Sequence, residues 1–278
     1  IGSFSEARQW QLAVDATEAQ FGANSTSVCG DASCPTTWSN PSNVQADDGS
    51  YAAATAKFKN QAGNPMDRIK TQDMGFTAVS GTIGDIVVEL QGNDTQPGGC
   101  NDYDARLLND TGTEVGPDKS RGTGTHWGTT EEIWSYTWTS AEHGLTATQI
   151  QDADFGFYID VEADANVFCQ PRLDYIKVTV NYTPTVTLGG TVYTNEGTTN
   201  IGINKTVDLR VNGAGTYTDE TDTNGVWSIS NVVLVSGDVA TIYLDDETEE
   251  GTTVMVSDGT AKSDIDLYVG RVVVRHDT

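Results

Sequence analysis

The chain lacks a long hydrophobic segment and is poor in basic residues. Its 278 residues include no apolar run of about 18 residues, so we expect no transmembrane helix. Only 15 Lys and Arg accompany 40 Asp and Glu, which gives a net charge of −25. Because this charge repels nucleic acids and anionic membranes, we expect neither of them as a partner.

Residues typical of hydrolytic chemistry are also scarce. The three histidines, His126, His143 and His276, are not accompanied by a Gly-x-Ser-x-Gly or Cys-His signature. The many acidic residues would place some carboxylate pair at a glycosidase-like separation by chance, so they do not indicate a glycosidase. We therefore expect no catalytic residue, and a secreted hydrolase is only a minor alternative.

Cysteine is limited to Cys29, Cys34, Cys100 and Cys169. An even count in a chain of this composition favours disulfides and an extracellular, secreted protein over zinc, which usually needs closely spaced cysteine pairs. The short separation predicts a Cys29–Cys34 disulfide, and Cys100 then pairs with Cys169 across about 70 residues. Residue 1 is Ile rather than Met, and we expect that a signal peptide or longer precursor was removed, or that the sequence was trimmed.

The sequence is rich in β-strand patterns. Residues 83–90 form a run with many β-branched residues, and residues 178–182 and 207–211 alternate with period two. Clusters of Gly, Asn, Asp and Thr separate such segments at short intervals, which is typical of β-sandwiches. We therefore predict an all-β chain, with one short helical turn near residues 147–150 and Thr146 as its N-cap.

The character of the sequence changes around Pro184, which cannot donate a hydrogen bond to a β-ladder. We therefore predict two β-sandwich domains in series along the chain. Residues 24–183 form the first, and residues 184–278 form a smaller second domain that ends in a strand. Residues 1–23 are an N-terminal extension.

Six short segments of the first block form a recognisable set. They are Trp38-Ser39-Asn40-Pro41, Asp48-Gly49-Ser50-Tyr51, Gly75-Phe76, Ile86-Val87-Val88-Glu89-Leu90, Phe155-Gly156-Phe157 and Asp174-Tyr175-Ile176-Lys177-Val178. The set resembles a jelly-roll-like domain of large secreted and surface proteins from uncultured bacteria and archaea. The resemblance implies a surface or filament component and carries no assigned chemistry. The cysteines and the acidic loop at residues 92–104 depart from the usual pattern.

The second block has strand patterns at residues 186–193 and 207–211. A turn at residues 221–225 then leads into an aromatic strand, and a Gly237-Asp238 turn precedes another. Its Asn224-Gly225 pair favours a hairpin, because both residues tolerate positive φ. The block resembles the small immunoglobulin-like, prealbumin-type domains (carboxypeptidase-regulatory or Cna-B-like) of bacterial and archaeal surface proteins, and the resemblance implies the same kind of sandwich here.

Two acidic turns are candidate metal sites. Calcium prefers several carboxylate and carbonyl oxygens, and the best pairs are Asp47 with Asp48 and Asp152 with Asp154. These carboxylates would bind a structural calcium ion, which is the one cofactor that the sequence suggests. The alternative is that both are solvated turns.

Aromatic residues cluster between residues 127 and 138. Trp134, Tyr136 and Trp138 alternate and so share one face of a strand, and Trp127 lies close by in sequence. If this face is exposed, Trp127, Trp134 and Trp138 form a platform on which sugars can stack. If it faces inward, the residues belong to the core.

Five Asn-x-Ser/Thr triplets are candidate glycosylation sites, provided the protein is secreted. Their asparagines are Asn24, Asn93, Asn109, Asn181 and Asn204.

The N-terminal segment has a strand-like pattern, in which Trp10, Leu12 and Val14 share one face. An isolated strand is stabilised only when its backbone groups find partners. We therefore predict that residues 1–20 act as a donor strand that inserts into the sheet of another copy. The alternatives are that this segment is the first strand of its own domain, or that the C-terminal strand at residues 265–275 is the donor.

These features together predict a non-enzymatic extracellular structural protein. It would be a homopolymeric subunit of a surface filament or appendage, assembled by strand exchange between copies. The alternative is a carbohydrate-binding or adhesive module, such as a phage-fibre or enzyme accessory domain, with surface glycans as its partner.

Overall fold

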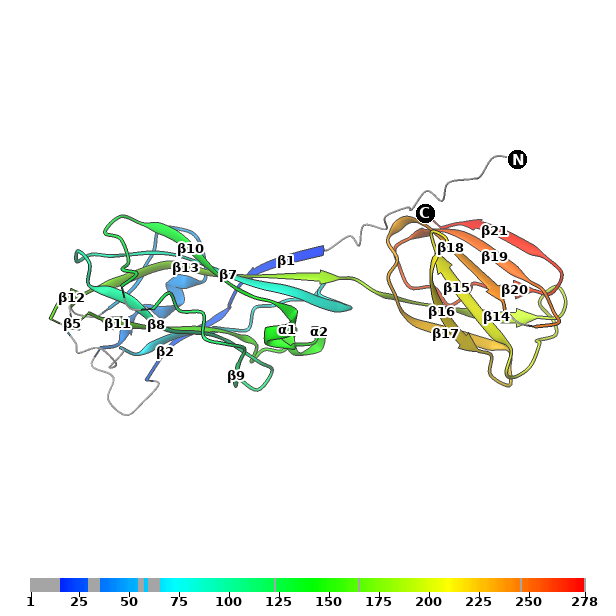
Figure 1. The fold of residues 1–278 in the computed structure, drawn as a ribbon, viewed down its shortest axis with the longest axis horizontal. Helices are drawn as coiled ribbons and strands as arrows, with labels where there is room; N and C mark the ends of the chain where they lie inside the picture. The colour runs from blue at the N-terminus through cyan, green and yellow to red at the C-terminus, as the bar shows by residue number, and fades with distance from the viewer. Residues whose placement is uncertain are drawn as a thin grey trace, which may run out of the picture. The chain divides into compact units, whose positions relative to one another are not determined.

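The chain is almost entirely β-structure, as predicted. The computed structural model describes residues 16–29, 36–54, 58–59, 66–122, 124–164, 166–245 and 247–277. These residues form two compact units, residues 16–182 and residues 183–277, which are coloured from blue to green and from green to red in Figure 1. The division falls immediately before Pro184, where the sequence places the joint.

The first unit contains two main sheets. One has the strand order β10-β7-β13-β4-β3, with β1 also paired to β13, and the other has the order β2-β6-β11-β8-β9. The strands of the first sheet are β1 (Ala16–Phe21), β3 (Trp38–Ser39), β4 (Ala52–Ala54), β7 (Thr82–Asp94), β10 (Glu132–Trp138) and β13 (Pro171–Thr183). Those of the second are β2 (Asn24–Val28), β6 (Arg68–Gln72), β8 (Cys100–Leu108), β9 (Glu114–Val115) and β11 (Gly156–Ala163).

Shorter elements complete this unit. β12 (Phe168–Cys169) pairs with β5 (Phe58–Lys59), and a 3-10 turn, η1, covers Pro41–Val44. Two single-turn helices follow β10, α1 (Ser140–His143) and α2 (Ala147–Ile150). Thr146 caps α2 by accepting a hydrogen bond from the backbone N–H of Gln149, which confirms the predicted N-cap.

Aromatic side chains join the two sheets of the first unit. Trp134, Tyr136 and Trp138 on β10 alternate with exposed residues and point into the core. The rings of Tyr136 and Trp138 lie 6.0 and 6.1 Å from the ring of Phe157, which belongs to β11 of the opposite sheet. Because each such side chain buries about 150–250 Å², this contact is a major source of the unit's stability.

The N-terminal boundary differs from the prediction. β1 pairs antiparallel with β13 along its whole length, from Ala16 opposite Tyr182 to Phe21 opposite Lys177. Residues 16–23 therefore belong to the first unit, and the predicted extension at residues 1–23 is too long, because the ladder with β13 satisfies the backbone of this segment locally. Trp10, Leu12 and Val14 lie outside the described residues.

The second unit also consists of two sheets, with the strand orders β17-β14-β20 and β16-β15-β18-β19-β21. The strands of the first are β14 (Val186–Tyr193), β17 (Val226–Val232) and β20 (Leu267–Tyr268). Those of the second are β15 (Thr206–Val211), β16 (Ala214–Glu220), β18 (Ser236–Leu244), β19 (Thr252–Asp258) and β21 (Val272–His276). Trp227, Leu209 and Ile242 come from both sheets and lie in one buried cluster.

The turn at Asn224-Gly225 forms, but it does not close a hairpin. The strand before it, β16, and the strand after it, β17, belong to different sheets. The tight hairpin of this unit lies instead between β15 and β16, where Asn212 and Gly213 both have positive φ, 51° and 75°. Two consecutive residues with positive φ are what a two-residue hairpin of type I′ requires.

We predict that Trp138→Ala lowers the free energy of unfolding of the first unit by about 3–5 kcal/mol, because it leaves a large cavity between the sheets. Ile133→Ala is the matched control, since Ile133 lies on the same strand and is 60% exposed. Its effect should stay within about 0.5 kcal/mol. Urea denaturation followed by tryptophan fluorescence measures this unit, because Trp227 is the one tryptophan after residue 182. Equal losses in the two variants would contradict the assignment.

Candidate functional site

A disulfide fixes one end of the first unit. It joins Cys100, at the start of β8, to Cys169, at the end of β12, and this is the pairing expected from the sequence. The bond closes a separation of 69 residues, which in the chain-entropy description stabilises the folded state by about 4 kcal/mol. The other predicted pair includes Cys34, which lies outside the described residues.

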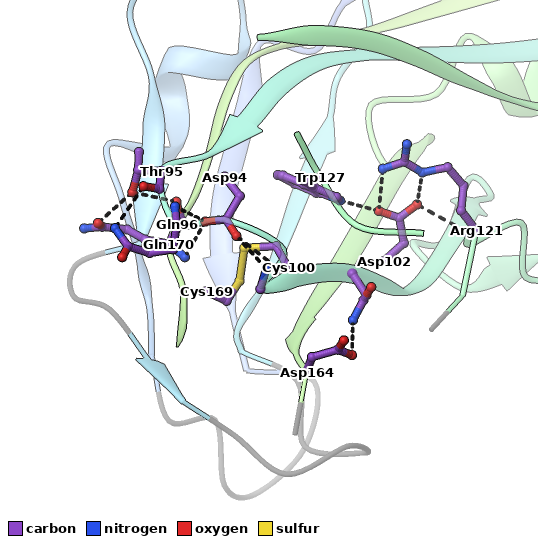
Figure 2. Close-up of a disulfide and its surroundings, with 12 residues drawn as sticks. Asp94, Thr95, Gln96, Cys100, Asp102, Arg121, Trp127, Asp164, Cys169 and Gln170 are labelled. Carbon is purple, nitrogen blue, oxygen red and sulfur yellow. Dashed lines mark hydrogen bonds and ion pairs between the residues drawn. A yellow bond between two sulfur atoms is a disulfide. The ribbon is translucent and has the colours of Figure 1, made fainter. Parts of the chain in front are cut away.

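Asp94 lies beside this disulfide and organises the loop that follows β7 (Figure 2). Its carboxylate accepts hydrogen bonds from the backbone N–H groups of Gln96, Gly99, Cys100 and Gln170, at 2.9–3.2 Å. Burial raises the pKa of Asp94, while these four donors act in the opposite direction. The Asp94 carboxylate therefore provides the hydrogen-bond acceptors that these backbone N–H groups need.

Asp94, Cys100 and Cys169 bring three potential metal ligands within 4.8 Å of one another, the one such group among the described residues. A metal binds the thiolate form of cysteine. Both sulfur atoms are committed to the disulfide, so the group is not suited to hold a metal.

Asp102 is a second buried carboxylate, and a β-bulge places it in the core. On β8, Asp104 lies opposite Asp160, but the next pair joins Asp102 to Val161, so Tyr103 is an extra residue. Without that extra residue, the period-two alternation would turn Asp102 outward. The bulge thus aims a carboxylate at the core aromatic residues.

Polar groups around Asp102 satisfy it completely (Figure 2). Trp127 donates its indole N–H at 2.6 Å, Tyr136 donates its hydroxyl at 2.6 Å, and Arg121 donates through Nε at 2.8 Å. The Arg121 guanidinium also lies 4.5 Å from the centre of the Trp134 ring. Burial acts to lower the pKa of Arg121, but its hydrogen bond to Asp102 and the nearby negative charges act in the opposite direction, and the pKa is raised. Such a closed network orders the core.

A third charged cluster lies on the opposite face of β8 and β11. Arg68 stacks over the Tyr158 ring at 3.9 Å and contacts Asp160 and Glu114, each at 3.3 Å. Tyr158 donates its hydroxyl to Asp104 at 2.7 Å. Asp160 is almost fully buried, and its Oδ1 has no hydrogen-bond partner among the described residues. Burial raises its pKa to about 7, even though Arg68 opposes the shift.

Of the two alternatives for the aromatic cluster, the structure supports the core and contradicts the sugar platform. Trp127, Trp134 and Trp138 are only 1, 8 and 0% exposed. The alternation on β10 turns Trp134 and Trp138 toward the second sheet. Trp127 and Trp134 also contact each other in a tilted arrangement, with ring centres 4.8 Å apart. They form core rather than a binding face.

The predicted calcium ligands lie in exposed turns. Asp48 accepts a hydrogen bond from the Ser50 backbone N–H, and Asp152 accepts one from the Asp154 backbone N–H. Neither Asp47 with Asp48 nor Asp152 with Asp154 joins a third ligand-type side chain among the described residues. The local hydrogen bonds account for these acids as turn residues, and a calcium ion stays a prediction.

The histidines are dispersed. His143 is buried, with Nε2 2.8 Å from the Gly84 carbonyl oxygen and Nδ1 accepting from the Leu145 backbone N–H. His126 lies 3.4 Å from Asp164, and His276 lies on β21. The structure therefore brings no two of them together into a shared site.

The five glycosylation candidates differ in accessibility. Asn24 and Asn204 are exposed. Asn93 and Asn181 are half-buried and donate their side-chain amides to the carbonyls of Thr129 and Asp85, while Asn109 accepts from the backbone of its own turn. Asn24 and Asn204 are thus the sites where a glycan would displace least.

Comparisons with known proteins place the chain in no family. No known family matches it, and no curated protein is similar to it. Solved structures with some likeness include the Bacillus anthracis TIE protein, at 8% identity and a TM-score of 0.24, over 96% of this chain and 42% of that one. Another is a beta-1,2-glucanase from Parabacteroides distasonis, at 9% identity and a TM-score of 0.30, over 92% and 37%.

The chain thus spans about two fifths of the length of these two structures. TM-scores this low assign neither a fold family nor an activity. No helix among the described residues is both long and apolar enough to cross a membrane.

We predict that the free energy of unfolding of the first unit falls as the pH rises from about 4 to about 7, by up to about 4 kcal/mol from Asp160 alone. Its pKa is about 7 in the folded state against 3.8 for the free side chain. Between these values the folded state binds the extra proton, so stability is present at low pH and is lost as the pH rises.

Asp160→Asn should remove this component, which is measured as the difference between variant and parent in urea denaturation at pH 4.5, 6 and 8. Asp47→Asn serves as the control, because Asp47 is exposed. If the parent and Asp160→Asn show the same pH dependence, Asp160 does not titrate as described.

Proposed function

We propose that the chain is a non-enzymatic, extracellular structural protein that assembles with copies of itself into a surface filament or appendage by strand exchange. The observation that carries the proposal is the edge strand β21. Val272 and Val274 on this strand are 71 and 78% exposed, in a chain whose net charge is −25. An edge strand with exposed apolar side chains promotes pairing with another chain, and it is costly unless such pairing occurs.

The use of buried polar groups supports a structural role. Asp94 and Asp102 are each enclosed by donors of the protein itself, and Tyr136 and Trp134 complete the second network. Networks of this kind make a fold rigid and specific. They suit a subunit that bears load more than a site that binds and releases a substrate.

Two resemblances support the same role. The first unit resembles jelly-roll-like domains, and the second resembles prealbumin-type domains, both from secreted or surface proteins of bacteria and archaea. The Cys100–Cys169 disulfide is consistent with an oxidising, extracellular setting. Glycosylation of Asn24 and Asn204 fits that setting and remains a prediction.

The alternative, a carbohydrate-binding or adhesive module, loses its main support. It depends on an exposed aromatic platform, and Trp127, Trp134 and Trp138 are core residues. We therefore give preference to self-assembly.

We predict that the purified chain forms fibres visible by negative-stain microscopy when it is concentrated. A variant that lacks residues 1–15 should remain folded and monomeric. It loses the predicted donor residues Trp10, Leu12 and Val14 but retains all of β1, which begins at Ala16. Circular dichroism checks the fold, and light scattering measures the size.

Two outcomes would contradict the proposal. One is a full-length chain that stays monomeric at high concentration and binds defined sugars on a glycan array. The other is a truncated variant that forms fibres as readily as the parent, which would contradict strand exchange through the N-terminal donor, although the chain would still self-assemble.

A further inference from the structure

The five-stranded sheet of the second unit carries an apolar stripe on its outer face. β21 runs parallel to β19, with Thr252 opposite Val272 and Val254 opposite Val274, and β18 follows on the other side of β19. The register places five valines on this face, and we call them the valine stripe: Val239, Val254, Val256, Val272 and Val274. A contiguous apolar surface on a soluble protein marks an interaction site.

The stripe ends at an open sheet edge. Among the described residues β21 has one neighbouring strand, β19. Half of the backbone N–H and C=O groups of such a strand point away from the sheet and are available to an added strand. The position therefore offers main-chain hydrogen bonds and apolar contacts together, the two requirements for β-augmentation.

A groove lies beside the same edge and includes one residue of the stripe, Val272. It has a volume of about 610 Å³ and is lined by Glu196, Tyr268, Arg271, Val272 and Val273. The Tyr268 ring stacks on Tyr193 at 5.7 Å, and Arg271 forms an ion pair with Glu196. Apart from Val272 and Val273, this groove presents hydroxyl and charged groups, so its chemistry differs from that of the rest of the valine stripe.

We propose that this edge of the second unit is the acceptor for the N-terminal segment, residues 9–15, of another copy of the chain. The inference rests on the proposed function and specifies which surfaces meet. Trp10, Leu12 and Val14 would extend the valine stripe. Gln9, Gln11, Ala13 and Asp15 would face the groove.

Two properties of the sequence favour this occupant. Its alternation is two-sided, apolar at residues 10, 12 and 14 and mostly polar at residues 9, 11, 13 and 15, which matches the two chemistries of the edge. The stretch from Trp10 to Val14 is five residues long, the same as β21.

The segment is also well placed along its own chain. Residues 1–15 directly precede β1, which is already paired to β13. Cross-strand contacts between aromatic and β-branched side chains, such as Trp10 or Leu12 beside Val272 and Val274, stabilise such pairing.

Cysteine trapping between two separately produced chains tests the pairing. Leu12→Cys in one chain and Val274→Cys in the other should form a mixed disulfide under mild oxidation, because both side chains lie on the stripe face. Ala13→Cys should link to Val274→Cys much less, since it faces the groove. Val226→Cys is the surface control, because Val226 is 43% exposed on β17 of the other sheet.

A second variant tests the acceptor without cysteine chemistry. Val274→Lys should raise the concentration needed for assembly at least about tenfold, because a buried valine contact is replaced by a charge. Val226→Lys should leave it unchanged. Circular dichroism and the urea midpoint report whether either variant is unfolded.

The outcomes separate this inference from the proposed function. Normal fibres without the Leu12–Val274 link, and with no effect of Val274→Lys, would overturn the acceptor while self-assembly survives. Efficient homodimers of the Val274→Cys chain would show that β21 pairs with β21 instead, which also overturns it. A parent chain that never assembles would refute both proposals.

Discussion

Every strand in an all-β chain must find partners for its backbone groups, and this requirement governs both units. Most strands at the ends of the sheets are short or polar: β3, β9 and β20 have two residues each. β16 is rich in Gly, Thr and acidic residues. Such strands pair poorly with a second chain. β21 is different, because three valines in succession form an edge with two of them strongly exposed.

The same requirement explains the buried carboxylates of the first unit. Asp94 accepts hydrogen bonds from backbone N–H groups of the loop after β7. Asp102 accepts hydrogen bonds from the Trp127 indole, the Tyr136 hydroxyl and the Arg121 guanidinium. Asp160 is the exception, since one of its oxygens has no partner among the described residues and its pKa rises to about 7. The carboxylates of Asp94 and Asp102 are thus fully used in holding the fold of the unit together.

Much of the architecture could be predicted from the sequence, because it depends on local patterns. The period-two alternation of residues 178–182 and 207–211 identifies strands, and Pro184 marks the joint. The pattern could not show which face of the Trp134–Trp138 alternation is buried, since that depends on β11 in the opposite sheet. The Asn224-Gly225 turn is locally correct, but sequence alone does not show that it joins two sheets.

The buried network around Asp102 could not be predicted from the sequence, because it depends on a β-bulge. Asp102 would face outward by simple alternation, and only the extra residue Tyr103 turns it into the core. A bulge of this kind carries no compositional signal here. The end of the predicted extension was also misplaced, because pairing of residues 16–21 with β13, about 160 residues away, is a long-range contact.

Amide hydrogen exchange of β21 tests the central claim most directly. In dilute monomer the outward-pointing amides of Val272–His276 should exchange rapidly, and on assembly they should become protected, while the core strands β7 and β11 change little. Slow exchange of these β21 amides in the dilute monomer would contradict the account. So would fibres in which they remain as unprotected as before.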